Sequence, residues 1–186
     1  IRLRIRGAFL VYYRSMETTT PHETLQSAAV TFGRFNLLHK GHIDLFTKMS
    51  CYGTVYIGLS SAKGNLDAEA RKAVILKALQ PGVEAGLFEH GVKVIIAHQP
   101  FEVFEIVANE IGSEVTAFFG TDQDKLATSA SRAFGWDKKV IERLTSSTAV
   151  RALIDAEEWD CLEQIVPGKI IRDIVNLRLI ERNQHA

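Results

Sequence analysis

The apolar residues of this chain fall into short runs that alternate with helix-like segments from residue 28 onward. The runs SAAVTFG, TVYIGLS, VKVIIA and EVTAFFG are largely apolar or β-branched, which is typical of strands that are buried on both faces. Between them, HIDLFTKMSCY, DAEARKAVILKAL and EVFEIVANEIG space their apolar residues as amphipathic helices do. We expect KKVIERL to form a fifth strand and the chain from Ser147 onward to be helical.

This alternation predicts the fold class. Strands separated by helices form a parallel sheet that is covered on both faces, so we expect an α/β fold. The prediction is a single doubly wound, Rossmann-like domain over residues 28–186, with a five-stranded parallel sheet and C-terminal helices.

Residues 1–27 are expected to be an N-terminal extension, disordered in part. Four arginines surround a short apolar run ahead of Met16, where a polar, Thr-rich segment resembles a native N-terminus. We therefore expect residues 1–15 to come from an upstream start or an added, non-native sequence, with an extra edge strand as the alternative.

Composition narrows the range of partners. The 22 Lys and Arg residues balance the 22 Asp and Glu residues, and no basic stripe forms, which argues against a nucleic-acid partner. The apolar run at residues 7–13 is too short to span a membrane. Cys51 and Cys161 lie far apart with no metal-binding or redox spacing, so we expect a reducing compartment, the cytoplasm. Self-association into a homo-oligomer stays open.

The stretch GRFNLLHKGHIDLF lies where the first strand leads into the first helix, a place where doubly wound folds bind ligands. Gly33 and Gly41 let the backbone approach a ligand without a Cβ in the way. His39 and His42 are three apart, so at a helix start both imidazoles point toward free N–H groups that favour a phosphate. Fixed positive charge stands nearby at Arg34 and Lys40. A metal site would need a third ligand at suitable spacing, and none is evident, so we expect no metal here.

A second stretch, LTSSTAVRALI, offers similar chemistry much later in the chain. Hydroxyls at a helix start cap free N–H groups and can bond phosphate oxygens, and Ser146, Ser147 and Thr148 stand at such a start. Arg151, one turn later, can hold a phosphate through two hydrogen bonds. A simple helix cap is the alternative interpretation of the hydroxyls.

Together the two stretches resemble a known family. His39-Lys40-Gly41-His42 is similar to the H-x-G-H signature of the nucleotidylyltransferase superfamily, and SSTAVR is similar to its C-terminal Ser-Thr-Arg signature. The resemblance covers roughly residues 28–175 and is greatest to the nicotinamide-mononucleotide adenylyltransferases. It implies that His39, His42 and Arg151 are catalytic. The ATP-binding residues that it implies are Gly33, Arg34, Phe35, Lys40, Gly41, Gly120, Asp122, Ser146, Ser147 and Thr148.

Weaker matches imply an acceptor site. GLSSAKGN resembles the loop after the second strand of those enzymes, and AEARKAV resembles a helix start at which Ala70 replaces the usual Glu. The substrate-binding residues implied are Asn36, Ser60, Ser61 and Arg71. Leu37 stands where many of these enzymes have Pro, which predicts a less rigid loop and a different acceptor pocket. Trp136 and Phe119 could stack on a base, although a core position is the favoured interpretation.

The function implied is transfer of AMP from ATP to a phosphate monoester, with release of pyrophosphate and with Mg²⁺ brought mainly by ATP. Nicotinamide mononucleotide, which would give NAD, is the first choice of acceptor. Pantetheine phosphate, FMN or a CTP-dependent alcohol phosphate stay open, because the two motifs address only the triphosphate. A non-catalytic nucleotide sensor is the alternative from another class. No activated nucleophile stands out, so the acceptor phosphate itself is expected to attack.

Overall fold

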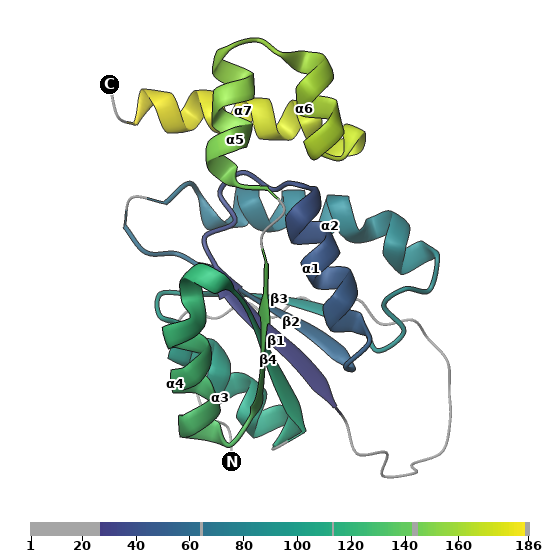
Figure 1. Cartoon of the computed structure of the whole chain (residues 1–186), viewed down its shortest axis with the longest axis vertical. Coiled ribbons are helices and arrows are strands. Elements are labelled where there is room, and N and C mark those ends of the chain that lie inside the picture. Colours follow the sequence, from purple (N-terminus) through teal and green to yellow (C-terminus); the bar gives the residue numbers. More distant parts are fainter. Residues whose placement is uncertain (1–26, 64, 113, 143–144, 185–186) are drawn as a thin grey trace.

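The protein forms one five-stranded sheet with helices on both faces (Figure 1). A computed structural model describes residues 27–184, except residues 64, 113 and 143–144. The strand order is β3-β2-β1-β4-β5, and every neighbouring pair is parallel. The strands are β1 Ala28–Gly33, β2 Thr54–Ser60, β3 Val92–Ala97, β4 Val115–Gly120 and β5 Asp137–Ile141. This confirms the predicted doubly wound α/β fold.

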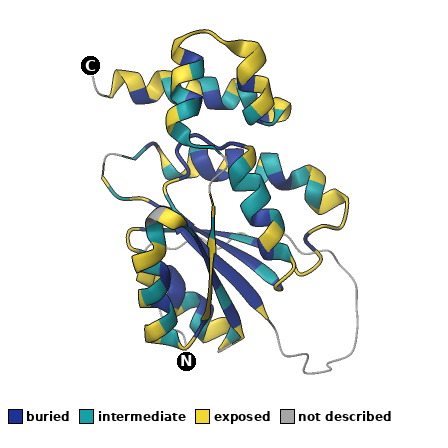
Figure 2. Cartoon of the chain, in the orientation of Figure 1, coloured by how far each residue is buried: buried dark blue, intermediate teal, exposed yellow. Residues whose placement is uncertain are grey.

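Successive residues of the central strands point to opposite faces of the sheet, so each strand supplies two separate cores. On one face, Ile57 packs with residues of α1 Lys40–Ser50 and α2 Ala68–Glu84. On the other, Tyr56 packs with residues of α3 Pro100–Ile111 and α4 Asp124–Phe134. Because both faces are covered, the central strands are buried along almost their whole length, as Figure 2 shows.

Local sequence sets several of the helix starts. The Asp67 carboxylate accepts a hydrogen bond from the Ala70 amide at 2.8 Å and caps α2. Pro100 occupies the first turn of α3, where its missing N–H costs nothing, and Glu102 accepts from the Gln99 amide at 3.1 Å. The α2 helix continues past Pro81 to Glu84, so it is longer than its apolar pattern predicts.

The C-terminal helices gather beyond one end of the sheet, the end toward which the strands run (Figure 1). They are α5 Ser147–Asp155, α6 Trp159–Ile165, the short helix η2 Gly168–Ile170 and α7 Ile171–Asn183. Ile170 joins these helices to the core beside α1 and α2, because its side chain is fully buried there. The predicted helical C-terminus is thereby confirmed, and it lies at the end of the sheet where doubly wound folds bind ligands.

Two further expectations can be set against the structure. Trp136 and Phe119 are both buried in the core on the α3 and α4 face, and the Trp136 indole donates to the Gly112 carbonyl at 3.3 Å, which confirms the core interpretation. The predicted extension at residues 1–27 lies, apart from Ser27, outside the described residues. Within the described ranges, no helix is both long and apolar enough to cross a bilayer.

Candidate active site

A cavity of about 290 Å³ opens at the ends of β1 and β4, where the chain turns to opposite faces of the sheet. Such a switch point is where open α/β sheets bind ligands. Residues from both motif stretches line the cavity, together with the ends of the strands. The lining residues are Thr31, Phe32, Gly33, Arg34, Phe35, Asn36, His39, Gly41, His42, Leu45, Ser60, Gly120, Gln123, Ile141, Glu142, Thr145, Ser146, Ser147, Thr148 and Arg151.

One side of the cavity, which we name the histidine wall, consists of residues 33–42. His39 precedes α1 in extended conformation, and His42 lies in the first turn of that helix. Their rings stack with centroids 3.7 Å apart, and the edge of Phe35 contacts His42. The two imidazoles therefore lie together at the helix N-terminus, as their spacing predicts. Gly41 makes this possible, since a Cβ there would lie only 3.1 Å from Nδ1 of His39.

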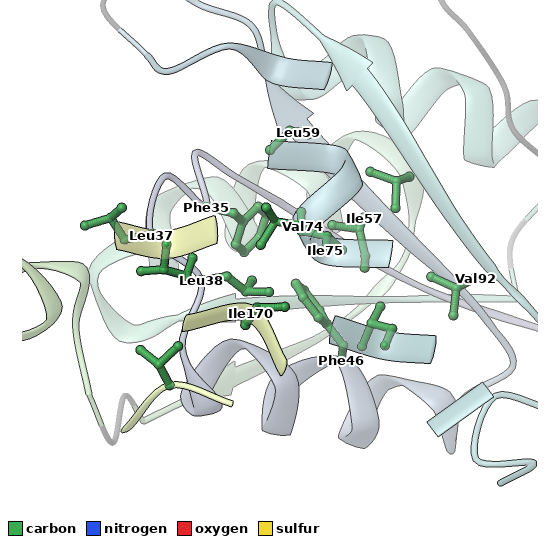
Figure 3. Close-up of a cluster of buried hydrophobic side chains, with 14 of the residues drawn as sticks. Phe35, Leu37, Leu38, Phe46, Ile57, Leu59, Val74, Ile75, Val92 and Ile170 are labelled. Atoms are coloured by element: carbon green, nitrogen blue, oxygen red, sulfur yellow. The ribbon is translucent and has the colours of Figure 1, made fainter. Parts of the chain in front are cut away.

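Apolar side chains anchor the histidine wall in the core. Phe35, Leu37 and Leu38 are buried among Ile57, Val74 and other residues, as Figure 3 shows. Leu37 is 0% exposed and is not among the lining residues. The loop is therefore packed against the core at Leu37, whose side chain does not itself reach the cavity, and the expected effects on loop rigidity and acceptor choice stay predictions.

Arg71 supports the histidine wall from beneath. Its guanidinium donates to backbone carbonyls of Arg34, Ser60 and Leu66, the last two at 2.8 and 2.9 Å. Burial lowers the pKa of Arg71 to about 10, although the negative charge of Asp67 partly offsets this by raising it. Arg71 does not line the cavity, so in this structure it joins the loop after β1 to the end of β2. Its predicted contact with substrate stays a prediction.

The facing side, which we name the serine wall, consists of residues 145–151. Ser146 caps α5 by accepting a hydrogen bond from the Ala149 amide at 3.2 Å, which confirms the predicted cap. The Ser147 hydroxyl donates to the Leu37 carbonyl at 3.3 Å and so joins the two walls. Thr148 is exposed at the cavity, and Arg151 lines it one turn farther along. The two motifs therefore meet across one cavity although they lie far apart in sequence.

Arg151 is paired with a carboxylate on α7. Its Nε and Nη2 atoms donate to the two oxygens of Glu181 at 2.8 and 2.6 Å. Arg178 donates to Glu181 at 2.9 Å and holds Asp155 through two further bonds. The bond to Glu181 raises the pKa of Arg151, and the same bond lowers the pKa of the Glu181 carboxyl. Arg151 is thus a fixed positive charge in a defined orientation.

Other predicted site residues lie in varied positions. Ser60 and Gly120 line the cavity, while Ser61 is exposed and outside it. Lys40 points toward α6, where its Nζ donates to the Glu163 carbonyl at 3.0 Å. The side chain of Asp122 falls outside the described part of the chain; the residue itself belongs to η1 Thr121–Gln123, after β4. No role for these residues is tested by their placement alone.

Asn36 has an unusual environment for an amide. It is 8% exposed, lines the cavity, and its Oδ1 atom has no hydrogen-bond partner among the described residues. A buried amide oxygen without a partner costs free energy, so a donor from a ligand would satisfy it. The histidine wall thus presents an unsatisfied hydrogen-bond acceptor as well as hydrogen-bond donors.

Sequence reasoning missed several lining residues. Thr31 and Phe32 lie in the last half of β1, Ile141 ends β5 and Glu142 follows it, and Thr145 precedes the α5 cap. The rule that ligands lie beyond the ends of parallel strands is the signal that would have found the first four. In the part of the chain that the structure describes, no three His, Cys, Asp or Glu side chains gather to hold a metal ion.

Comparisons with known proteins place the fold. The sequence matches no family model, and a search of curated proteins finds no match. Among solved structures, nicotinic acid mononucleotide adenylyltransferase from Plasmodium falciparum, complexed with NaAD, has a TM-score of 0.61 at 11% identity and covers 83% of this chain and 97% of its own. A Vibrio parahaemolyticus protein proposed to be a nicotinate-nucleotide adenylyltransferase has a TM-score of 0.60 at 15% identity, with 82% and 95% covered. This chain shares their fold.

Proposed function

We propose that the chain is an adenylyltransferase that transfers AMP from ATP to a phosphate-monoester acceptor. The observation that supports this most is the meeting of the stacked His39 and His42 rings with Ser147, Thr148 and Arg151 across one cavity. Each wall could be explained by itself as a local structural feature, whereas their meeting across one cavity favours a shared ligand. Together they provide donors and positive charge on two sides of a space about the size of a small ligand site.

In the proposed reaction, an oxygen of the acceptor phosphate attacks the α-phosphorus of ATP. The bond from that phosphorus to the bridging oxygen of the β-phosphate breaks, and pyrophosphate leaves with the Mg²⁺ that ATP brought. The attacking phosphate is largely ionised at neutral pH, so the protein need not remove a proton from it. Catalysis then depends on alignment and on stabilising charge.

The walls divide this work. His39 and His42 are proposed to bind the α-phosphate and the β- and γ-phosphates, with His42 the more directly catalytic of the two. The hydroxyls of Ser147 and Thr148 and the guanidinium of Arg151 are proposed to bind the β- and γ-phosphates. Arg34, exposed at the rim, adds positive charge. Charge-assisted hydrogen bonds of this kind are stronger than neutral ones, which suits them to stabilise a departing pyrophosphate.

The acceptor is proposed to be a pyridine mononucleotide, with nicotinamide mononucleotide first. The loop after β2 and the C-terminal helices resemble those of the nicotinamide-mononucleotide enzymes, and Ser60, the last residue of β2, lines the cavity. The Plasmodium falciparum protein of the same fold is a nicotinic acid mononucleotide adenylyltransferase. Both the amide and the acid forms of the acceptor therefore belong in the test.

The decisive experiment measures the release of pyrophosphate from ATP, in the presence of Mg²⁺, with a panel of acceptors. The panel contains nicotinamide and nicotinate mononucleotides, pantetheine phosphate and FMN, with CTP and an alcohol phosphate as a separate arm. Release with one pyridine mononucleotide, lost in the double variant His39→Ala with His42→Ala, would support the proposal. The exposed His90 is the matched control, since His90→Ala should keep full activity. If none of the acceptors in the panel supported pyrophosphate release, the proposal would be overturned and a nucleotide sensor would be favoured.

A further inference from the structure

Glu181 is a buried carboxylate at the edge of the candidate active site. Its residue is only 7% exposed, and it lies on α7, an element that contributes no residue to the described cavity lining. Its two oxygens accept from Nε and Nη2 of Arg151, and one of them also accepts from Nη1 of Arg178. A buried carboxylate needs such partners, since removing an unpaired charge from water is strongly unfavourable.

The geometry leaves part of Arg151 available to a ligand. A guanidinium has five N–H donors in one plane, and Glu181 uses the side formed by Nε and Nη2. The Nη1 atom of Arg151 donates no hydrogen bond to any described residue. The edge formed by the two Nη atoms can therefore donate to a phosphate while the edge formed by Nε and Nη2 stays bonded to the Glu181 carboxylate.

Glu181 cannot readily leave this position. If a triphosphate displaced it from Arg151, the carboxylate would keep only the single bond from Arg178, and α7 would have to move to expose it to water. Breaking a buried ion pair in this way is strongly unfavourable. Glu181 is therefore better suited to hold Arg151 in place than to compete with the triphosphate for it.

We propose that Glu181 is a positioning residue that aims the Arg151 guanidinium at the β- and γ-phosphates of ATP. Arg178 and Asp155 support it, because Arg178 bonds both Glu181 and Asp155 and so ties α7 to the end of α5. This inference rests on the proposed function, in which Arg151 binds the triphosphate. It makes α7 a part of the active site although no α7 side chain reaches the cavity.

A double-mutant cycle between Glu181 and Arg151 tests the proposal. Glu181→Ala should lower kcat/KM for ATP by about ten- to a hundredfold, because a misplaced clamp loses the alignment on which transfer depends. In the Arg151→Ala background the same change should cost less than twofold. The KM of the acceptor should stay unchanged. Glu181→Gln keeps one acceptor oxygen and should fall between wild type and Glu181→Ala.

The matched control is Asp173→Ala on the same helix. Asp173 pairs with Lys77 of α2 at 2.6 Å and does not line the cavity, so its loss removes an α7 ion pair without touching Arg151. Its kcat/KM for ATP should remain within twofold of wild type. Thermal unfolding of every variant identifies any that fail to fold, in which case Glu181→Gln replaces Glu181→Ala in the cycle.

Two outcomes would overturn the inference. An equal loss in both backgrounds would show that Glu181 acts only on general structure, and tighter ATP binding in Glu181→Ala would show that it competes with the ligand. If wild type releases no pyrophosphate with any acceptor, the proposed function fails, and the cycle is repeated on the dissociation constant of Mg²⁺-ATP by calorimetry. Coupling there would still support the positioning role, and its absence would reject it.

Discussion

The two walls of the cavity are held by different forces. The histidine wall rests mainly on apolar side chains, with Leu37 and Leu38 buried in the core behind it, and Arg71 adds hydrogen bonds to backbone carbonyls. The serine wall holds its charged residue by ion pairs, from Arg151 through Glu181 to Arg178. Burial of apolar surface is insensitive to pH, whereas ion pairs depend on the ionisation of carboxylates. The comparison teaches that one site can combine a wall fixed by packing with one fixed by charge.

The largest expected effect comes from removing the packing behind the histidine wall. Leu37→Ala should lower the free energy of unfolding by about 2.7–5 kcal/mol, because the change leaves a cavity in a closed core. Chemical denaturation measures the loss. Leu179, half exposed on α7, is the control, and Leu179→Ala should change the free energy of unfolding by less than about 0.5 kcal/mol. Equal losses in the two variants would contradict the anchoring role of Leu37.

The next effect concerns the chemistry of the same wall. His42→Ala should lower turnover by about a hundred- to a thousandfold, the usual scale for one preorganised stabiliser of developing charge, while the fold survives. Steady-state kinetics with saturating ATP and acceptor measure turnover, and circular dichroism checks folding. Wild-type turnover in this variant would remove His42 from the mechanism.

A smaller effect is expected at the serine wall. Arg151→Ala should raise the KM for ATP by about ten- to a hundredfold, because hydrogen bonds from a charged group are lost. Arg151→Lys should restore little of that affinity, since an ammonium cannot present two parallel donors to a phosphate while a third N–H meets Glu181. An unchanged KM for ATP in the Ala variant would rule out a role for Arg151 in triphosphate binding.

The smallest expected effect is a pH dependence of stability, which the ion pair of the serine wall should show and the apolar packing of the histidine wall should not. The Glu181 carboxyl has its pKa lowered below the ordinary 4.5, chiefly by the hydrogen bonds from Arg151. A depressed carboxyl pKa adds stability that is fully present above the ordinary pKa and is lost as pH falls through the folded value. Between about pH 5 and pH 3, a range that spans the ordinary pKa of a glutamate carboxyl, the free energy of unfolding should therefore fall less in Glu181→Gln than in wild type. Parallel curves for the two proteins would argue against this stabilisation.

Much of the fold follows from local patterns in the sequence. The buried strands β1, β2 and β4 are short runs of apolar residues, and their period distinguishes them from the helices. The stacking of His39 on His42 also follows from spacing alone, because a helix start places positions three apart on one side. Features set by neighbours in the sequence are therefore predictable.

The remaining features depend on contacts between distant elements. Glu181 meets Arg151 only because α7 packs against α5, and nothing in the sequence near either residue marks the pair. Arg71 lies on a helix start that suits a phosphate ligand equally well, yet backbone carbonyls from two other segments surround its guanidinium. Leu37 was expected to loosen the loop because proline is absent, and its burial arises in a core cluster that also contains residues of α2 and η2.

The place of Glu181 in the chain also has a consequence for synthesis. Arg151 is synthesised 30 residues before Glu181, a difference that takes roughly 1.5–6 s at common elongation rates. During that interval a nascent chain already contains both histidines and Arg151 but not the carboxylate that orients the guanidinium. Under the proposed function, full transfer activity would then begin only once translation has passed α7.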